Sequence, residues 1–343
     1  MRTIGKQSGA MVQMENMPAV KSLLAELRSG LSNYWKVADG ILRQSGVTLR
    51  APQEDDFSFN KNFFSLLFLY SFHHAGIQKP RRILYAATLQ CLRGMVTGCD
   101  NLLDGEYKQT LDTDIPETGT RFRSVIDIMV SDRVLFQLLL EACRRQEINL
   151  NQAIEAAAGS MKTMTRSGVQ EASEEAGITT ILTPDDILQT VHHYKTGILF
   201  KCPWDIPLVV EDLDESEIAP LLEGLYCIGM GCQIMDDMVD FMSDLERKRH
   251  NFLVSLIHHS SNPLEKNRLH ELVDTGGRQQ LTDPAKDFPD SVIKASKTSH
   301  RFLENGLNLL FSEEHRFLVE PSIQFLEKRI GVSHLCRRQD NEI

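Results

Sequence analysis

Residues 233–244 read Gln-Ile-Met-Asp-Asp-Met-Val-Asp-Phe-Met-Ser-Asp, and this stretch determines how the rest of the chain is interpreted. Asp236, Asp240 and Asp244 recur every four residues, so three carboxylates share one side of a predicted helix whose other positions are largely apolar. A solvated helix normally interleaves lysine or arginine with such acids, yet the first cation here is Arg247. Carboxylates and substrate phosphates are the ligands that Mg²⁺ prefers. The stretch therefore predicts a magnesium site.

A short basic run follows these acids directly. Lys248, Arg249 and His250 precede Asn251. Positive charge beside carboxylates that hold Mg²⁺ suits a diphosphate that contacts both the metal and the cations. We therefore expect Lys248 and Arg249 to contribute to diphosphate binding.

Another pair of acids ends an earlier apolar helical run. Asp100 and Asp104, in the sequence Asp-Asn-Leu-Leu-Asp, lie one helical turn apart, so both carboxylates leave the same face. Two acids at a helix C-terminus repel each other and oppose the helix dipole, and a bound cation would relieve both costs. By itself this spacing is also typical of a solvated helix end.

Residues 192–200, His-His-Tyr-Lys-Thr-Gly-Ile-Leu-Phe, carry polar groups within an apolar helical pattern. Such groups are costly unless they are paired. We expect Lys195 to neutralise a diphosphate oxygen and Thr196 to lie near the end of the substrate that ionises. A lysine here could instead extend its ammonium to water. The two histidines are expected to be polar helix-face residues rather than ligands.

Helical periodicity dominates the rest of the chain. Apolar residues recur at three- and four-residue spacing over long segments, namely 19–44, 82–103, 122–145, 150–175 and 218–245. Alternating β-branched runs are nearly absent, so we predict an all-α fold. Segments 105–120 and 274–291 are rich in Gly, Pro, Asp and Thr and are predicted loops. Residues 1–16 are polar and aperiodic and are predicted to be disordered, which leaves 17–343 as a single helical domain.

Composition narrows the functional classes. The formal net charge is −10 and no basic face is visible, which argues against a nucleic-acid partner. The most apolar stretch, residues 63–72, is about half the length that spans a bilayer, and the N-terminus lacks the apolar segment of a secretion signal. The seven cysteines are scattered and form no CxxC pair. They are typical of reduced thiols rather than a zinc site, which predicts a cytoplasmic protein.

Together, the motifs resemble the trans-prenyl diphosphate synthases of the polyprenyl synthetase family, over roughly residues 55–335. The second aspartate motif of the family, QxxDDxxD, is matched in full by Gln233, Asp236, Asp237 and Asp240. In the first motif Asp100 and Asp104 match the outer acids, whereas Asn101 replaces the second aspartate. The remaining matches are Lys195 and Thr196 to a Lys-Thr motif, Gln170 to a Gly-Gln pair, and Lys248 to a following lysine.

The resemblance implies the class I isoprenoid synthase fold, a helical bundle around a central apolar cavity, and a homodimer. It implies that Mg²⁺, as three ions bound with the substrate diphosphate, is held by Asp100, Asp104, Asp236, Asp237, Asp240 and Asp244. It assigns catalysis to Lys195, Thr196, Gln233 and Asp236. It assigns diphosphate binding to Lys61, Gln170, Lys248 and Arg249.

The chain departs from the family where the family binds isopentenyl diphosphate. The Gly-Lys-x-x-Arg-Pro motif corresponds to residues 60–65, Asn-Lys-Asn-Phe-Phe-Ser, which retain Lys61 but no arginine. The double arginine that follows the first aspartate motif is also missing. The candidate replacements are Lys79, Arg81, Arg82 and Arg121.

The predicted activity is Mg²⁺-dependent ionisation of an allylic prenyl diphosphate, with transfer of the prenyl group to isopentenyl diphosphate or another acceptor. One alternative is a class I terpene synthase, in which the substrate's own double bond attacks the cation and diphosphate is released. A further alternative, suggested by the altered first motif, is a non-catalytic partner subunit of a prenyl synthase. The acidic helix followed by Arg-Lys-Arg-His-Asn also resembles squalene and phytoene synthases, a related group with the same fold.

Overall fold

The computed structural model describes Glu15 and residues 17–274 and 283–336. The predicted disorder of residues 1–16 therefore lies, apart from Glu15, outside the described residues. The structure is 77% helical and has no β-strand in its described part. Leu49 and Thr113 form an isolated antiparallel bridge. The predicted all-α class is thus confirmed.

The chain divides into two compact units. Unit 1 comprises Met1–Thr165 and Cys202–Ala219, and unit 2 comprises Arg166–Lys201 and Pro220–Ile343. Two long helices, α6 and α10, begin in unit 1 and end in unit 2. A single domain over 17–343 stays a prediction.

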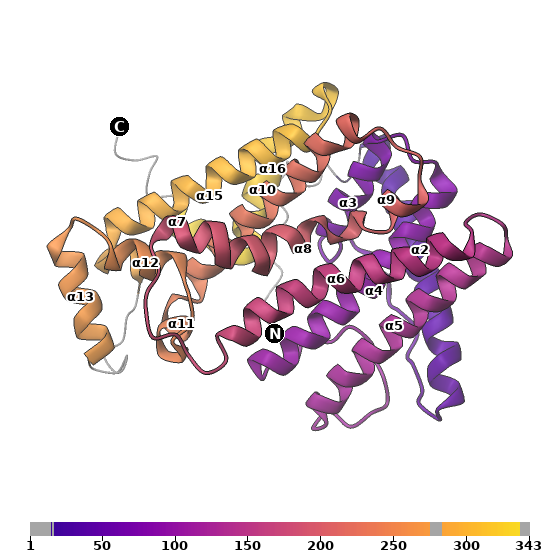
Figure 1. Ribbon diagram of the computed structural model, residues 1–343, viewed down its shortest axis with the longest axis horizontal. Coiled ribbons are helices and arrows are strands. Elements are labelled where there is room, and N and C mark those ends of the chain that lie inside the picture. The colour runs from indigo at the N-terminus through magenta and orange to yellow at the C-terminus, as the bar shows by residue number, and fades with distance from the viewer. Residues whose placement is uncertain (1–14, 16, 275–282, 337–343) are drawn as a thin grey trace. The chain divides into compact units, whose positions relative to one another are not determined.

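Unit 1 is built on three long helices that pack against one another. Helix α4 contacts α2 on one side and α5 on the other (Figure 1). Trp204 is fully buried against Phe72 in its core. The helical elements are α2 (Pro18–Gln44), η1 (Glu54–Phe57), α3 (Phe63–His74), α4 (Lys79–Asp104), α5 (Thr120–Arg144), most of α6 (Leu150–Ser173), η3 (Cys202–Trp204) and α9 (Pro207–Val210).

Helices α4 and α5 approach closely just before the first acidic motif. A Cβ added at Gly98 would lie 2.6 Å from Cγ1 of Ile128 and 2.9 Å from the Ser124 carbonyl oxygen. A side chain there would force the two helices apart, because real Cβ atoms do not approach other atoms so closely. Gly98 therefore fixes the end of α4, where Asp100 and Asp104 lie, against α5.

In unit 2, α15 packs against α12 and α16 (Figure 1, orange to yellow). The Ser299 hydroxyl of α15 donates to the Gly231 carbonyl of α10 at 2.8 Å, so α10 also joins this core. The elements are α7 (Pro184–Asp186), η2 (Ile187–Gly197), α8 (Ile198–Lys201), most of α10 (Glu215–Val239), α11 (Phe241–Arg247), α12 (Phe252–His258), α13 (Pro263–Asp274), α14 (Pro284–Asp287), α15 (Pro289–Leu310), η4 (Glu313–Leu318), α16 (Val319–Ile330) and α17 (Ser333–Cys336).

The predicted helices occur as α2, α4, α5, α6 and α10, with one difference in length. The last was predicted to run to residue 245, but α10 ends at Val239 and α11 begins at Phe241. At Asp240 the backbone angles are φ −90° and ψ 7°, outside the helical range. Backbone bonds still link Asp240 to Asp236 and Asp244 to Asp240, so the acids lie on a bent helix rather than a straight one.

Helix α10 is long and apolar enough to cross a membrane, judged by length and composition alone. Within the described residues it is the candidate that passes this test, and 72% of its apolar window is buried. It also carries Gln233, Asp236 and Asp237. A buried core helix accounts for this combination.

Candidate active site

The second acidic motif divides into an exposed and a buried part at the end of α10. Asp236 and Asp240 are exposed, Asp244 on α11 is partly buried, and Asp237 is only 3% exposed. Asp236 and Asp237 are neighbours on a helix and therefore point about 100° apart. The two adjacent aspartates therefore differ in surroundings: Asp236 faces solvent and Asp237 faces the core.

Asp237 is held by hydrogen bonds inside unit 2. Its Oδ2 accepts from His192 Nε2 at 2.9 Å and from the Phe252 backbone N–H at 2.5 Å, and its Oδ1 accepts from Gln233 Nε2 at 2.9 Å. Burial alone would raise the pKa of Asp237, but His192, the Phe252 N–H and Lys195 outweigh it, and the pKa is lowered. Both oxygens are thus used within the fold. These bonds fit a structural role, and the metal ligation expected of Asp237 stays a prediction.

Two polar side-chain pairs join α10 to the helix η2. His192 pairs with Asp237, and four residues further along η2 the Thr196 hydroxyl donates to Gln233 Oε1. The structure therefore brings Thr196 and Gln233 together, as expected for one site. Residues of η2 follow a π-helical pattern, which is rare and frequently found at functional sites. These two pairs fix the register between the helices.

Lys195 precedes Thr196 on η2 and pairs with one carboxylate. Its Nζ is 3.1 Å from Glu171 Oε1, and the side chain is 22% exposed. Burial would lower the pKa of Lys195, but Glu171, Asp237 and Asp244 together raise it above its ordinary value. Lys195 is therefore a partly buried, permanently charged cation rather than a lysine that reaches into water.

The charges around Asp244 bear on whether a divalent cation could bind there. Burial, and then the charge of Asp237, raise the pKa of Asp244 to about 7, even though Asn251 Nδ2 donates to it at 2.8 Å. An added cation would offset this excess of negative charge. In the part of the chain that the structure describes, no three acidic, His or Cys side chains converge to complete a metal site. Carboxylate oxygens suit a hard divalent cation, which completes its shell with phosphate and water.

The basic run and Gln170 are linked through Glu174. Gln170 Nε2 donates to Glu174 Oε1 at 3.0 Å, and the His250 backbone N–H donates to Glu174 Oε2 at 2.9 Å. Lys248 has a positive φ of 55°, which is uncommon for a residue with a side chain and costs about 1 kcal/mol or more. This conformation turns the chain after α11, so that the Lys248 carbonyl accepts from the Ile178 N–H at 2.7 Å.

The first acidic motif ends α4 in unit 1. Asp100 and Asp104 are partly buried, whereas Asn101 is only 4% exposed. Gly105 ends the helix in the left-handed conformation, with φ 67°. Asp100 and Asp104 therefore occupy the last turn of α4, as expected from the sequence.

Three of the cations expected to bind an acceptor form ion pairs with acidic side chains of unit 1. Lys61 Nζ lies 2.8 Å from Asp55 Oδ2 and 2.9 Å from Asp56 Oδ1. The buried Arg82 makes a two-pronged bond to Glu26, at 2.7 and 2.8 Å. Arg81 pairs with Glu211 at 3.6 Å. Of the candidate replacements, Lys79 and Arg121 are exposed.

Sequence reasoning missed several residues of this site. His192 was expected to be a polar face residue, yet it is fully buried in a bond to Asp237. Asn251 caps α12 through Val254 N and also donates to the Asp237 carbonyl at 2.7 Å. The position of Asn251 just before an apolar helical run was the available signal. No such signal exists for Glu171 and Glu174.

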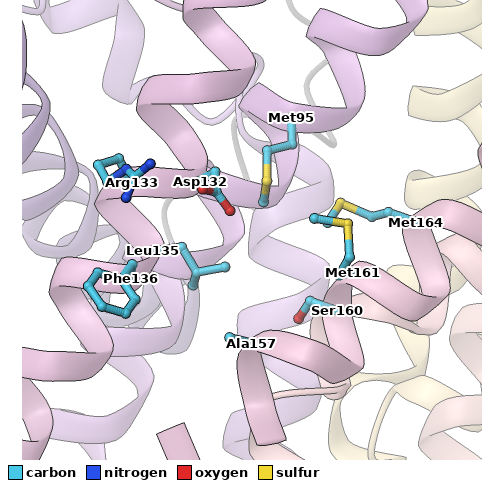
Figure 2. A pocket seen from close by; sticks show the side chains of 9 residues that line it. All are labelled: Met95, Asp132, Arg133, Leu135, Phe136, Ala157, Ser160, Met161 and Met164. Atoms are coloured by element: carbon cyan, nitrogen blue, oxygen red, sulfur yellow. The ribbon is translucent and has the colours of Figure 1, made fainter. Parts of the chain in front are cut away.

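Unit 1 contains a cavity of about 120 Å³ between α4, α5 and α6, lined by apolar side chains together with Asp132, Arg133 and Ser160 (Figure 2). Figure 2 shows the side chains of Met95, Met161 and Met164 around it. Methionine adapts its shape to irregular apolar contents. Met95 lies on α4, five residues before Asp100, so the cavity is on the helix that carries the first acidic motif.

Solved structures share this fold. Geranylgeranyl pyrophosphate synthetase from Pyrococcus horikoshii is 15% identical with a TM-score of 0.60, over 89% of this chain and 98% of that one. Decaprenyl diphosphate synthase from Rhodobacter capsulatus is 16% identical with a TM-score of 0.57, over 90% and 99%. A polyprenyl synthase from Caulobacter crescentus, complexed with calcium and isoprenyl diphosphate, is 12% identical with a TM-score of 0.59, over 92% and 98%. These likenesses define the class: an all-α isoprenoid synthase fold.

The polyprenyl synthetase family model matches residues 122–258. The matched region contains Lys195 and the second acidic motif, and it begins after Asp104. Residues 122–258 are thus similar to the family that the motifs predicted, in the part of the chain that holds its most specific residues. No curated protein matches the chain.

Proposed function

We propose that this protein is a prenyltransferase, which ionises an allylic prenyl diphosphate with the help of a divalent metal and transfers the prenyl group to an acceptor. The observation that carries the proposal is the joining of the Lys195 helix to the second acidic motif. The His192–Asp237 and Thr196–Gln233 pairs fix η2 against the helix that carries Asp236, and so hold a charged lysine, a hydroxyl and an amide in place. Groups held in advance near developing charge are what an ionisation step needs.

The metal ligands in this proposal are Asp236 and Asp240, together with Asp100 and Asp104. Asp244 lies a further turn away and contributes less, while Asp237 acts by positioning its neighbours. A bound metal would supply Lewis-acid neutralisation of the charge that develops on the leaving diphosphate. Mg²⁺ suits carboxylate and phosphate oxygens best, and three ions remain the expected number.

The chain's own cations complete the charge balance. Lys195 stays protonated because Glu171 and neighbouring aspartates raise its pKa, so it can exchange its contact with Glu171 for a diphosphate oxygen. Lys248 and Arg249 follow the acids directly and would contact the same diphosphate. The Thr196–Gln233 pair offers oxygen atoms near the carbon from which diphosphate departs, where partial negative charge stabilises an allylic cation.

The acceptor is expected to be other than isopentenyl diphosphate, or to include it only with weak affinity. Lys61 and Arg82 are already paired with acids, and the arginines that the family uses are absent from residues 60–65. An uncharged acceptor or a second allylic substrate needs fewer fixed cations. A homodimer in the cytoplasm remains the expected state of the protein.

Of the two alternatives, the comparisons give no support to a terpene cyclase, because the family model and the similar structures are all prenyl synthases. The partner-subunit alternative predicts no metal-dependent binding of an allylic diphosphate. That difference makes binding the first test.

Calorimetric titration with a non-cleavable thio analogue of farnesyl diphosphate, with and without Mg²⁺, measures this binding. We expect binding that requires Mg²⁺ and weakens at least tenfold in Lys195→Ala, because one charge-assisted bond is lost. The exposed Lys297 of α15 provides the matched control, Lys297→Ala, which should bind as the wild type does. Equal binding in EDTA, or none under any condition, would contradict the proposal.

A further inference from the structure

Asn101 is where the first acidic motif departs from its resemblance, since an aspartate is expected there. A lost metal ligand should lie near the surface with the other acids. Asn101 instead is 4% exposed, while Asp100 and Asp104 on either side are partly buried. Its side chain therefore points into unit 1 rather than along the face that the two aspartates share.

Both ends of the Asn101 amide bond to one residue. Asn101 Nδ2 donates to the Lys108 carbonyl oxygen at 3.0 Å, and the Lys108 N–H donates to Asn101 Oδ1 at 2.8 Å. The side chain thus pairs with the Lys108 backbone as a neighbouring strand would. A carboxylate accepts hydrogen bonds but donates none, so an aspartate could make only one of these two bonds.

The segment after α4 is held at a second place by backbone contacts. The Arg50 N–H donates to the Asp112 carbonyl at 2.8 Å, and the Asp114 N–H donates to the Thr48 carbonyl at 3.1 Å. Leu111, directly before Asp112, is fully buried. The sequence predicted a loop here, and these contacts hold residues 108–114 of that loop in place.

We infer that Asn101 is a positioning residue for the first acidic motif. By tying Lys108 to α4, it closes the turn that begins at Gly105 and fixes the direction of Asp104, the last residue of the helix. The inference rests on the proposed function insofar as Asp100 and Asp104 bind the metal and diphosphate. The asparagine is therefore a working part of this motif and not a degraded ligand.

The variant Asn101→Asp distinguishes these two readings by the sign of its effect. If the asparagine is a lost ligand, restoring the acid should raise activity or lower the metal requirement. If Asn101 positions the motif, the aspartate loses the bond to the Lys108 carbonyl and adds a third negative charge to the end of α4. We then expect turnover to fall roughly tenfold. The Mg²⁺ concentration for half-maximal activity should rise several-fold, with little change in KM for the allylic substrate.

Two further variants serve as controls. Asn101→Ser removes both bonds without adding charge and should lower turnover to a similar extent. Asn151→Asp adds the same charge at an exposed position in the first turn of α6, and it should leave turnover and metal requirement unchanged. A general loss of stability would lower the melting temperature without moving the half-maximal Mg²⁺ concentration.

Hydrogen exchange separates this inference from the proposed function, because it needs no substrate. We expect amides of residues 106–110 to exchange at least tenfold faster in both Asn101 variants than in the wild type. Unchanged exchange there, or higher activity in Asn101→Asp, would overturn the inference. If the wild type turns over no allylic diphosphate, the proposed function fails, and the exchange rates alone decide whether Asn101 fixes this segment.

Discussion

The two acidic motifs of this protein are supported in different ways. The second motif, in unit 2, is held by bonds between side chains: His192 to Asp237, Gln233 to Asp237, and Thr196 to Gln233. The first motif, in unit 1, is supported by an asparagine bonded to backbone. Side chain to side chain pairs demand particular residues at both ends, whereas a backbone partner is offered by every residue.

The two units also differ in how many carboxylates pair with a lysine that is expected to bind diphosphate. Lys195 keeps 22% of its side chain exposed and has one close carboxylate, Glu171. Lys61 is 46% exposed and is paired with both Asp55 and Asp56. An incoming diphosphate must compete with one acid at Lys195 and with two at Lys61. The comparison therefore predicts an ionisation site that is ready for its substrate and an acceptor site that is not.

The largest expected effect is on Asp236, which is exposed at the end of α10. Asp236→Ala should lower turnover by about 10²–10³ or more, because it removes a ligand from the charge-neutralising site. Asp244→Ala should cost less, since Asp244 lies a turn further along. The control is Glu246→Ala, at an exposed position of α11, which should retain full activity. Steady-state kinetics with an allylic diphosphate would measure these effects, and full activity of Asp236→Ala would remove the metal assignment.

The neighbouring Asp237 should affect stability instead. Asp237→Ala leaves His192, Gln233 and the Phe252 N–H without their acceptor, so we expect a loss of about 3–5 kcal/mol in the free energy of unfolding. Asp236→Ala should lose under about 0.5 kcal/mol, typical of a surface change. Urea unfolding measures both variants. Adding His192→Ala and the double variant His192→Ala/Asp237→Ala completes a double-mutant cycle, which gives the pairing energy of His192 with Asp237. Equal stability of both single variants would mean that the division between exposed and buried acids is wrong.

A smaller effect is expected at the acceptor site. Asp55→Asn weakens one of the two carboxylate contacts of Lys61 and leaves Asp56, whose Oδ2 accepts from the Gln53 N–H at 2.7 Å, in place. KM for isopentenyl diphosphate should then fall several-fold from a high starting value, since a lysine–anion contact becomes available. The control is Asp39→Asn on α2, because Asp39 pairs with Arg43 rather than Lys61, and it should give no such change. An ordinary micromolar KM in the wild type would show that other cations bind this substrate.

Much of this arrangement follows from local sequence. The three- and four-residue periodicity predicted the long helices, which the structure shows as α2, α4, α5, α6 and α10. The grouping of Thr196 with Gln233 followed from the family motifs. The burial of Asp237 also had a signal, because it lies between the exposed positions of a four-residue repeat.

Other features depend on tertiary contacts that no local pattern reveals. His192 and Asp237 are 45 residues apart and meet only because η2 packs beside α10. The bond from Asn101 to Lys108 requires the left-handed turn at Gly105, which composition presented as a flexible loop. The bend at Asp240 was likewise missed, because a helical pattern does not record one non-helical residue.

The last expected effect concerns the pH dependence of stability near the first motif. Asp127, on α5, is 2% exposed, and burial raises its pKa from 3.8 to about 6 even though Thr110, Arg123 and Tyr107 act against this. A raised carboxyl pKa means that the folded state binds the proton more tightly. Stability should therefore fall as pH rises from about 4 to 6, by at most about 3 kcal/mol.

Unfolding of Asp127→Asn over this pH range tests that expectation. The variant should lose the fall in stability, while Asp132→Asn, at an exposed position of the same helix, should keep it. A wild-type stability that rises between pH 4 and 6, with Asp127 as its source, would show that Arg123 outweighs burial.

The most direct test of the account is product analysis after incubation with geranyl, farnesyl and geranylgeranyl diphosphates, each with and without isopentenyl diphosphate, in Mg²⁺ or in EDTA. We predict Mg²⁺-dependent release of diphosphate from an allylic substrate and prenyl transfer, with elongation by isopentenyl diphosphate slow and unsaturated at micromolar concentrations. Full turnover in EDTA, no turnover with any allylic substrate, or a cyclic hydrocarbon formed without an acceptor would contradict it.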